Sequence, residues 1–432
     1  MKLRIAVCLS LLSTPVFAQP TPQVLTIEQA VELALKNQPS LRQSRAALEA
    51  SRGHVDQVEA TQRPTLSLSA SASVGGGGPS RDFVDPSASS AIGASAQWRI
   101  TDFGQTAAQL RAAVLNASAT EAGLQTDLLD VRNQVELDYL AAVARTRLVT
   151  VADATVKSEE THLDQAKRFV QAQAKDPIEV VQAQARAANA RAALAQAQSA
   201  AAVAIATLRA AIGEVDPAST IMVASNWPVP PEQPPASVPD LVATARQYRP
   251  EIVQLDREVE AAEANIEAAR AERRPVLSAN AQTQWSPSWS RVADMNGEHF
   301  HDPQPAWSVG LSLTWLAYDG GRSAADVRVA RANRESALAQ RDALLIDLTN
   351  QIDAARAAID ANRAATQAST EAVDAARAQL KLAEARYAQG LGSQIELTDA
   401  QTAVTTAEGN LIQSEFQLAT AWATLRRSLG GK

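Results

Sequence analysis

Few side chains in this sequence could do chemistry, and they are widely separated. Its single cysteine is Cys8, and two of its four histidines, His54 and His162, are isolated within segments of helical composition. The other two form the run His299-Phe300-His301-Asp302, which has metal-ligand residue types but no second cluster in the sequence to complete a site. No serine, histidine and aspartate arrangement indicates a nucleophile. We therefore expect no enzyme, metal or cofactor, and we interpret 299–302 as part of a plain loop.

An acidic pair is the most suggestive chemical feature. Glu396 and Asp399 are three residues apart, which places them on one face of a helix. Glu179 occupies the position equivalent to Glu396 in an internal repeat (396 − 179 = 217). Grouped carboxylates attract cations and can hold a passage closed through hydrogen bonds. The simpler interpretation is a set of solvated acids near helix N-termini, which the helix dipole stabilises. Both interpretations stay open.

The elements that must position these residues occur twice. Arg63-Pro64 matches Arg274-Pro275 at an offset of 211 (275 − 64), and Trp98 matches Trp315 at an offset of 217 (315 − 98). Two constant offsets separated by one small insertion indicate a duplication. We predict a first structural repeat over 19–213, a Pro-rich linker over 214–240 and a second repeat over 241–432.

The start of the sequence predicts export. Residues 1–18 have the basic, apolar and small-residue regions of a signal peptide, and Cys8 lies inside it. The formal net charge is −7, and no basic stripe suits nucleic acid. No apolar run reaches the ~18–20 residues of a spanning helix. The exported protein is therefore expected to be periplasmic, secreted, or in an outer membrane as β structure.

Four segments alternate between apolar and polar residues over about ten positions, the pattern of a tilted transmembrane β-strand. They are 65–74, 90–100, 276–285 and 307–315. A half-buried strand of a soluble sheet would show the same period, but scarce tryptophans near the strand ends favour a membrane girdle. The girdle residues are Trp98, Trp285, Trp307 and Trp315. Four strands cannot close a barrel, so we predict one shared between chains: eight strands in a dimer or twelve in a trimer.

Long helices fill most of the remaining sequence. Helix-forming residues run without proline through 105–174 and 322–389, and each run is followed by a short break and a return helix. The return helices are predicted at 178–212 and 394–429, and shorter helices at 39–63 and 250–274 lead into the strands. The predicted fold is mainly α, with long antiparallel coiled-coil helices and a small β part.

This plan resembles the TolC-like outer-membrane efflux family over nearly all of the chain. The residues that carry the resemblance are Leu25-Thr26-Ile27-Glu28-Gln29-Ala30, the junctions Arg63-Pro64 and Arg274-Pro275, the turns Asp102-Phe103-Gly104 and Asp319-Gly320-Gly321, and the run Arg386-Tyr387-Ala388-Gln389-Gly390. The resemblance implies a homotrimer with a 12-stranded β-barrel in the outer membrane of a Gram-negative bacterium and an α-barrel in the periplasm. It also implies a passive exit duct that works with a periplasmic adaptor and an inner-membrane pump.

The resemblance assigns roles to residues at the helical tips. It implies a carboxylate ring at the narrowest point, formed by Glu396, Asp399 and Glu179. It implies closure and adaptor docking by Tyr387, Gln389, Gly390, Leu391 and Phe169. The first tip departs from the pattern, with Ala172 where glycine is usual, which puts docking there in doubt. Two alternatives remain: a type I protein-secretion duct on the same scaffold, and a periplasmic coiled-coil adaptor or structural protein.

Overall fold

A computed structural model describes residues 23–80, 83–214, 221–224, 227, 236–292 and 297–431. The predicted signal segment 1–18, with Cys8, lies outside these residues. The chain divides into two compact units. The sheet unit comprises Ser40–Leu129, Ala236–Ala354 and Arg426–Lys432, and the helical unit comprises Met1–Pro39, Asp130–Pro235 and Ala355–Leu425. In the described part of the chain, no helix is both long and apolar enough to cross a membrane.

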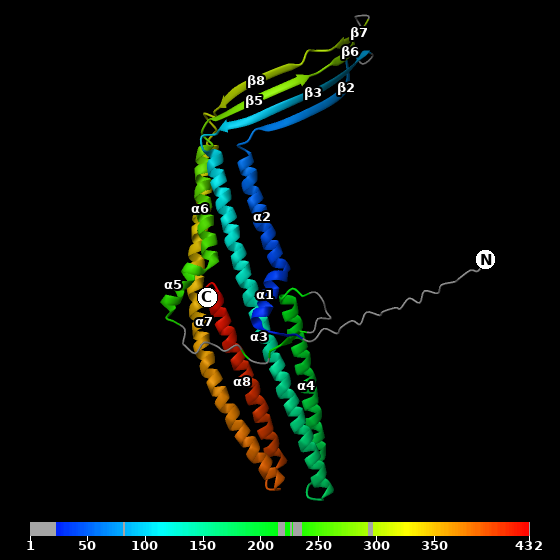
Figure 1. The fold of residues 1–432 in the computed structure, drawn as a ribbon, viewed down its shortest axis with the longest axis vertical. Coiled ribbons are helices and arrows are strands. Elements are labelled where there is room, and N and C mark those ends of the chain that lie inside the picture. The colour runs from blue at the N-terminus through cyan, green and yellow to red at the C-terminus, as the bar shows by residue number, and fades with distance from the viewer. Residues whose placement is uncertain are drawn as a thin grey trace, which may run out of the picture. The chain divides into compact units, whose positions relative to one another are not determined.

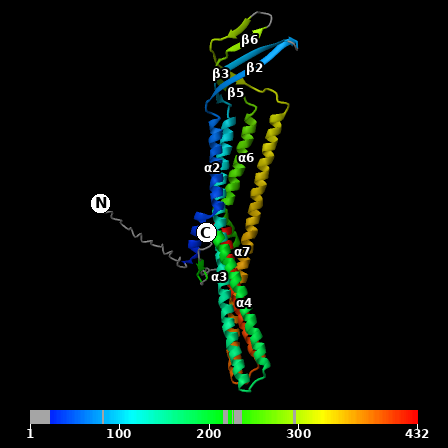
Figure 2. The ribbon, with the colours of Figure 1, turned by 90° about the vertical axis from the view of Figure 1, so that its right-hand side faces the viewer.

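Four helices lead to or from the β-sheet of the sheet unit, which includes α3 up to Leu129 and α7 up to Ala354. Helices α2 (Pro39–Ala60) and α6 (Pro250–Ala271) run toward the sheet, while α3 (Gln105–Gln171) and α7 (Arg322–Ala388) run away from it (Figures 1 and 2). The short helix α5 (Val238–Tyr248) precedes α6. The structure confirms the two long helices, α3 and α7, and the two helices that lead into strands, α2 and α6. Their ends lie within three residues of the predicted ends.

The two strand-to-helix turns are built alike. Asp102 accepts hydrogen bonds from the backbone N–H of Gly104 (3.2 Å) and Thr106 (2.9 Å), which caps the start of α3. Asp319 accepts from Gly321 and Ser323 (both 2.9 Å) before α7. Gly320 has a left-handed backbone (φ 68°), and the equivalent position in the first copy is Phe103 (φ 55°). The first copy therefore holds a non-glycine residue in a conformation that glycine adopts without cost.

The sheet of this unit is antiparallel. Strand β3 (Phe83–Thr101) pairs with β2 (Thr65–Ser80) on one side and with β5 (Val276–Trp285) and β6 (Ser288–Val292) on the other. Strand β5 pairs with β8 (Ala306–Thr314), and β6 pairs with β7 (Gly297–His301). Figure 1 shows β2 and β8 as the outer strands along this sheet.

Strands also form in the two segments that join the predicted strands, 75–88 and 286–306, where we expected loops from the sequence. Of the Gly-rich segment 75–88, the described residues 75–80 and 83–88 continue β2 and β3, and the segment 286–306 contains β6 and β7. A break at Ser286-Pro287 separates β5 from β6, and the carbonyl of Pro287 accepts a hydrogen bond from the N–H of Ser90 (3.0 Å). Because β5 and β6 both pair with β3, they follow one strand path with an interruption. The four predicted strands are therefore confirmed as four paths, two of which are broken.

The two faces of the sheet differ in chemistry. Leu66, Leu68, Val309, Leu311 and Leu313 are exposed, with exposed fractions of 65–79%. On the alternate positions, serine hydroxyls meet across the strands: Ser67 and Ser95 are 2.7 Å apart, and Ser73 and Ser89 are 2.8 Å apart. One face of this sheet is thus largely apolar, as a strand that faces lipid requires.

The helical unit has a small core that the sequence patterns did not predict. Helix α1 (Ile27–Asn37) begins with a capping box in which Thr26 and Gln29 bond to each other's backbone N–H. Strand β1 (Gln23–Leu25) pairs in parallel with β4 (Ile221–Val223), which lies within the predicted linker. The hydroxyl of Tyr139 donates to the carbonyl of Leu25 (2.9 Å) and accepts from the N–H of Ala224 (3.3 Å). This bond pair ties both strands to α3.

The return helices complete the helical unit. They are α4 (Ile178–Ala211) and α8 (Gln394–Ser428), and they pack largely through alanine, with Ala183, Ala187, Ala400 and Ala423 buried. The part of α3 in the sheet unit also buries alanine: Val114 is 47% exposed while the neighbouring Ala112 and Ala113 are buried. Close backbone approach selects the small side chain there, so the buried face follows alanine more than the larger residues.

Candidate functional site at the helical tips

Both tip turns in the helical unit have the same backbone design. In the second, Gly390 is left-handed (φ 73°), and the N–H of Leu391 donates to the carbonyl of Arg386 (2.9 Å). In the first tip turn, Gln173 has a left-handed backbone (φ 57°), and the N–H of Ala174 donates to the carbonyl of Phe169 (2.9 Å). These residues match at the offset of 217 (390 − 173). The position that favours glycine is therefore Gln173, one residue after the Ala172 identified from the sequence.

Glu179 connects the two tips. Its Oε2 accepts a hydrogen bond from the hydroxyl of Tyr387 (3.1 Å), and its Oε1 lies 3.4 Å from the Nζ of Lys175. The side-chain amide of Gln394 donates to the main-chain carbonyl of Glu179 (3.2 Å). Glu179 at the start of α4 is thus held by both ends of the α7–α8 turn. We call Glu179, Lys175, Tyr387 and Gln394 the tip clamp.

Tyr387 is the buried member of the tip clamp, with only 2% of its surface exposed. Its ring meets that of Phe169 edge to face (centroids 5.6 Å apart, 80° between planes), and the Nζ of Lys175 lies 5.4 Å from its centroid. Burial, helped by the negative charge of Glu179, raises the pKa of Tyr387 to about 12. Tyr387 therefore stays a neutral hydrogen-bond donor at physiological pH.

The predicted acidic residues have different surroundings. Glu179 belongs to the tip clamp, and its side chain is only 16% exposed. Ser393 caps the start of α8, where its hydroxyl accepts a hydrogen bond from the backbone N–H of Glu396 (3.1 Å), and the carboxylate of Glu396 pairs with Arg386 (3.1 Å). Asp399, one turn further along α8, is exposed. Glu396 and Asp399 lie together near the tip, while Glu179 is engaged in a contact between hairpins.

The predicted docking residues separate into two groups. Gln389, Gly390 and Leu391 are exposed at the turn, and Leu391 has 71% of its surface accessible. Tyr387 is buried and Phe169 packs against it, so these two rings support the turn from inside. The burial of Tyr387 suits the closing role that the resemblance implies for the aromatic residue before the turn, and that role remains a prediction. Docking by the exposed residues remains a prediction.

The four predicted girdle tryptophans are all exposed and lie along the sheet of the sheet unit. Trp98 donates its indole N–H to the carbonyl of Gln62 (2.9 Å), and Trp315 donates to that of Arg273 (3.1 Å). Trp285 donates to the carboxylate of Asp302 (3.0 Å), and Trp307 is 78% exposed on β8. The bonds of Trp98 and Trp315 each tie a strand end to the helix–strand junction of the same repeat.

The helical unit contains one charged cluster that the sequence did not predict. Arg147 of α3 and Glu415 of α8 form an ion pair (2.5 Å), and the indole N–H of Trp227 donates to the same carboxylate oxygen (2.7 Å). Burial raises the pKa of Glu415, although Arg147 opposes the shift. Trp227 belongs to the predicted linker, and no spacing pattern relates it to these helices. Similarly, nothing in the sequence marks Gln394 as a partner of Glu179.

Among the described residues, no group of three or more His, Cys, Asp or Glu side chains is arranged to hold a metal ion. Residues His299 to His301 of the run noted in the sequence belong to β7, which pairs with β6, and Asp302 follows the strand.

Comparison with known families identifies this arrangement. The model of the family described as "Outer membrane efflux protein" matches residues 30–214 and 241–431, which is most of the chain. The chain belongs to the outer membrane efflux protein family. It is accordingly an outer-membrane protein of the efflux type, and the TolC-like resemblance is confirmed.

Individual relatives of this efflux protein agree with that assignment. It is 27% identical over 418 residues to the outer membrane protein OprJ of Pseudomonas aeruginosa, covering 94% of this chain and 84% of the relative. It is 25% identical over 415 residues to the probable efflux pump outer membrane protein TtgC of Pseudomonas putida, covering 94% and 83%. The solved structure of the Campylobacter jejuni CmeC outer membrane channel has the same fold, with a TM-score of 0.79 and 17% identity, and the match covers 100% of this chain and 94% of the channel.

Proposed function

We propose that three copies of this efflux protein share one 12-stranded β-barrel and form a passive exit duct that is not an enzyme. The observation that carries the proposal is the pairing of the sheet: among the described strands, β2 bonds only to β3 and β8 bonds only to β5. Unpaired backbone groups are not tolerated in the hydrocarbon of a bilayer. Because one face of the sheet is apolar, the edges are expected to close by pairing β8 of one copy with β2 of the next.

The tip clamp is proposed to hold the periplasmic end of the duct closed. Tyr387 and Gln394 join the α7–α8 turn to Glu179 of α4, so the two hairpins cannot separate until these bonds break. Glu396 and Asp399, repeated in three copies, would place carboxylates around the closed end and favour cations.

The partners follow from the family. Relatives such as TtgC are named as outer membrane proteins of efflux pumps. By analogy, we propose that an inner-membrane pump supplies energy and that a periplasmic adaptor contacts the exposed turn residues Gln389, Gly390 and Leu391. The matched family and relatives such as TtgC are described as efflux proteins, so the protein-secretion duct and the periplasmic adaptor are not favoured.

The test is planar-bilayer conductance of the purified protein in detergent, paired with its native mass. A trimer that gives small, cation-preferring currents supports the duct with a closed end. A stable monomer or dimer without currents would refute the shared barrel. Introducing one cysteine in β2 and one in β8 adds a direct check, because a crosslink between copies is expected only if these edges meet.

A further inference from the structure

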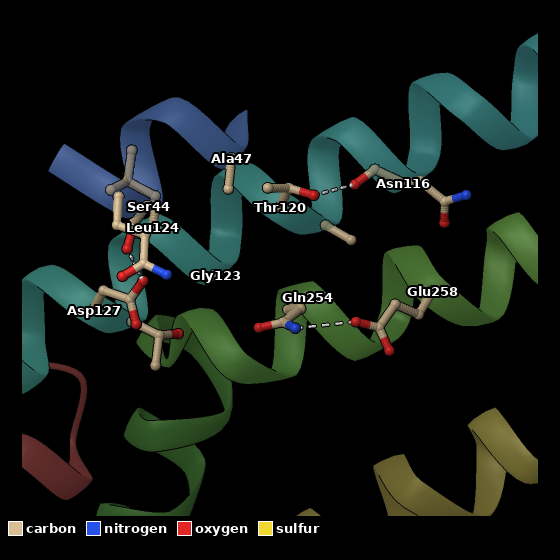
Figure 3. Close-up of a pocket in the computed structure, with 12 residues that line it drawn as sticks. Ser44, Ala47, Asn116, Thr120, Gly123, Leu124, Asp127, Gln254 and Glu258 are labelled. Atoms are coloured by element: carbon tan, nitrogen blue, oxygen red, sulfur yellow. Dashed lines mark hydrogen bonds between the residues drawn. The ribbon is translucent and has the colours of Figure 1, made fainter. Parts of the chain in front are cut away.

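A polar cavity in the sheet unit has no role in the proposed duct. It has a volume of about 580 Å³, within the ~300–1,000 Å³ range typical of ligand sites. Helices α2, α3 and α6 line it, as Figure 3 shows. The only glycine in α3, Gly123, opens toward it, since a Cβ there would lie 3.4 Å from the Oε1 of Gln254.

The residues that line the cavity include acidic side chains but no basic side chain to balance their negative charge. Of the 12 lining residues, all in the described part of the chain, two are carboxylates and none is basic. Asp127 accepts a hydrogen bond from the hydroxyl of Ser44 (2.5 Å), and Glu258 accepts one from the amide of Gln254 (3.0 Å). Each of these bonds joins one carboxylate oxygen to a neutral donor. The negative charge of the cavity therefore has no cationic partner in its wall.

The spacing of the two carboxylates selects the shape of the ligand. Helix α3 runs away from the sheet and α6 runs toward it, so the two helices are antiparallel. Gly123 faces Gln254; Asp127 is one turn beyond Gly123, and Glu258 is one turn beyond Gln254 in the opposite direction. At 1.5 Å per residue, the carboxylates are separated by ~12 Å along the helix axes. Figure 3 places them on either side of Gln254.

We propose that this cavity binds a linear polyamine. The two terminal ammonium groups would pair with Asp127 and Glu258, and a central amine would lie beside the amide oxygen of Gln254. A metal ion suits the cavity poorly, because the two carboxylates stand at opposite ends and cannot share one ion. Ammonium–carboxylate hydrogen bonds are charge-assisted, which provides affinity in a partly hydrated cavity. The proposal does not depend on the export function.

The experiment is isothermal titration calorimetry of the full-length protein in detergent at low salt, with spermidine and putrescine as probes. Extended spermidine can reach both carboxylates, whereas putrescine is too short, so spermidine is expected to bind at least tenfold more tightly. Asp127→Asn and Glu258→Gln are each expected to weaken spermidine binding about tenfold and to leave putrescine nearly unchanged. Circular dichroism of each variant verifies that the fold is retained.

The matched control is Glu121→Gln. Glu121 lies on the same helix and outside the cavity, with its side chain 58% exposed near Arg52. The Glu121→Gln substitution removes the same negative charge as the other two. Because Glu121 does not line the cavity, this variant is expected to bind spermidine as tightly as the unmodified protein. Equal losses in all three variants would show general electrostatic attraction and overturn the site. No loss in Asp127→Asn and Glu258→Gln, or equal affinity for the two probes, would overturn it as well.

Discussion

The hydroxyl of Tyr387 lies 3.1 Å from the Oε2 of Glu179, although 208 residues separate them in the sequence. This hydrogen bond joins the two hairpins of the helical unit at their tips. The surrounding contacts exclude water from the Tyr387 ring and keep its hydroxyl protonated. A neutral donor paired with a carboxylate gives a bond that is independent of pH over the physiological range.

Removing this hydroxyl is expected to loosen the tips. A hydrogen bond to a charged group contributes about 1.5–3 kcal/mol, so Tyr387→Phe should increase the open fraction of the channel while the ring still packs against Phe169. Single-channel recordings in planar bilayers measure the change. Tyr318→Phe, which removes an exposed hydroxyl, is the matched control. Identical conductance of Tyr387→Phe and the unmodified protein would remove the tip clamp as a closing element.

The acidic pair is expected to set ion selectivity. Replacing both Glu396 and Asp399 with alanine removes two negative charges near the tip of each copy, so the preference for cations should fall. Reversal potentials in a salt gradient give the selectivity. The double substitution of Glu371 and Asp374 is the matched control, because these acids are also three residues apart and exposed on a helix. If selectivity is unchanged only in the control, the ring hypothesis is supported; no change in either variant rejects it.

The first tip turn should be stabilised by glycine. Gln173 has φ of 57°, a conformation that costs a non-glycine residue about 1 kcal/mol. Gln173→Gly is therefore expected to raise the melting temperature, and Gly390→Ala to lower it. Gly390 has open space around it, so only backbone strain acts in that variant. Thermal melts of the detergent-purified protein provide the comparison; a lower melting temperature for Gln173→Gly would contradict the backbone argument.

Asp319 should make the turn before α7 sensitive to acid. The side-chain hydrogen bond from Ser323, together with backbone N–H donors, lowers the pKa of Asp319 from 3.8 to about 2. The pKa is lower in the folded state, so its stabilisation is present above pH 3.8 and is lost as the pH falls through about 2. The unmodified protein should melt at a higher temperature than Asp319→Asn at neutral pH, and the difference should shrink toward pH 2.

The control for this pH series is Asp374→Asn on the exposed surface of α7. Its melting temperature should follow that of the unmodified protein at every pH. A constant difference between Asp319→Asn and the unmodified protein down to pH 2 would show that the carboxylate does not act through its charge.

The sequence alone determined the repeated order of elements. Period-two alternation over 65–74 and 307–315 predicted strands, and long runs without proline predicted α3 and α7, because both signals arise from local backbone preference and side-chain periodicity. The two offsets also predicted which residues are equivalent: Trp98 and Trp315 make the same contact in each copy. Local signals failed within 286–306, where β6 forms by pairing with β3 and β7 forms by pairing with β6.

Only the tertiary structure decided which distant side chains meet. Gln394 contacts Glu179, and Trp227 contacts Glu415, through the packing of helices whose relative rotation is not encoded in a local pattern. Burial of Tyr387 likewise depends on Phe169 from the other hairpin. Hydrophobic periodicity specifies which face of a helix is buried, but the partner on that face is selected by the summed packing of all the helices around it.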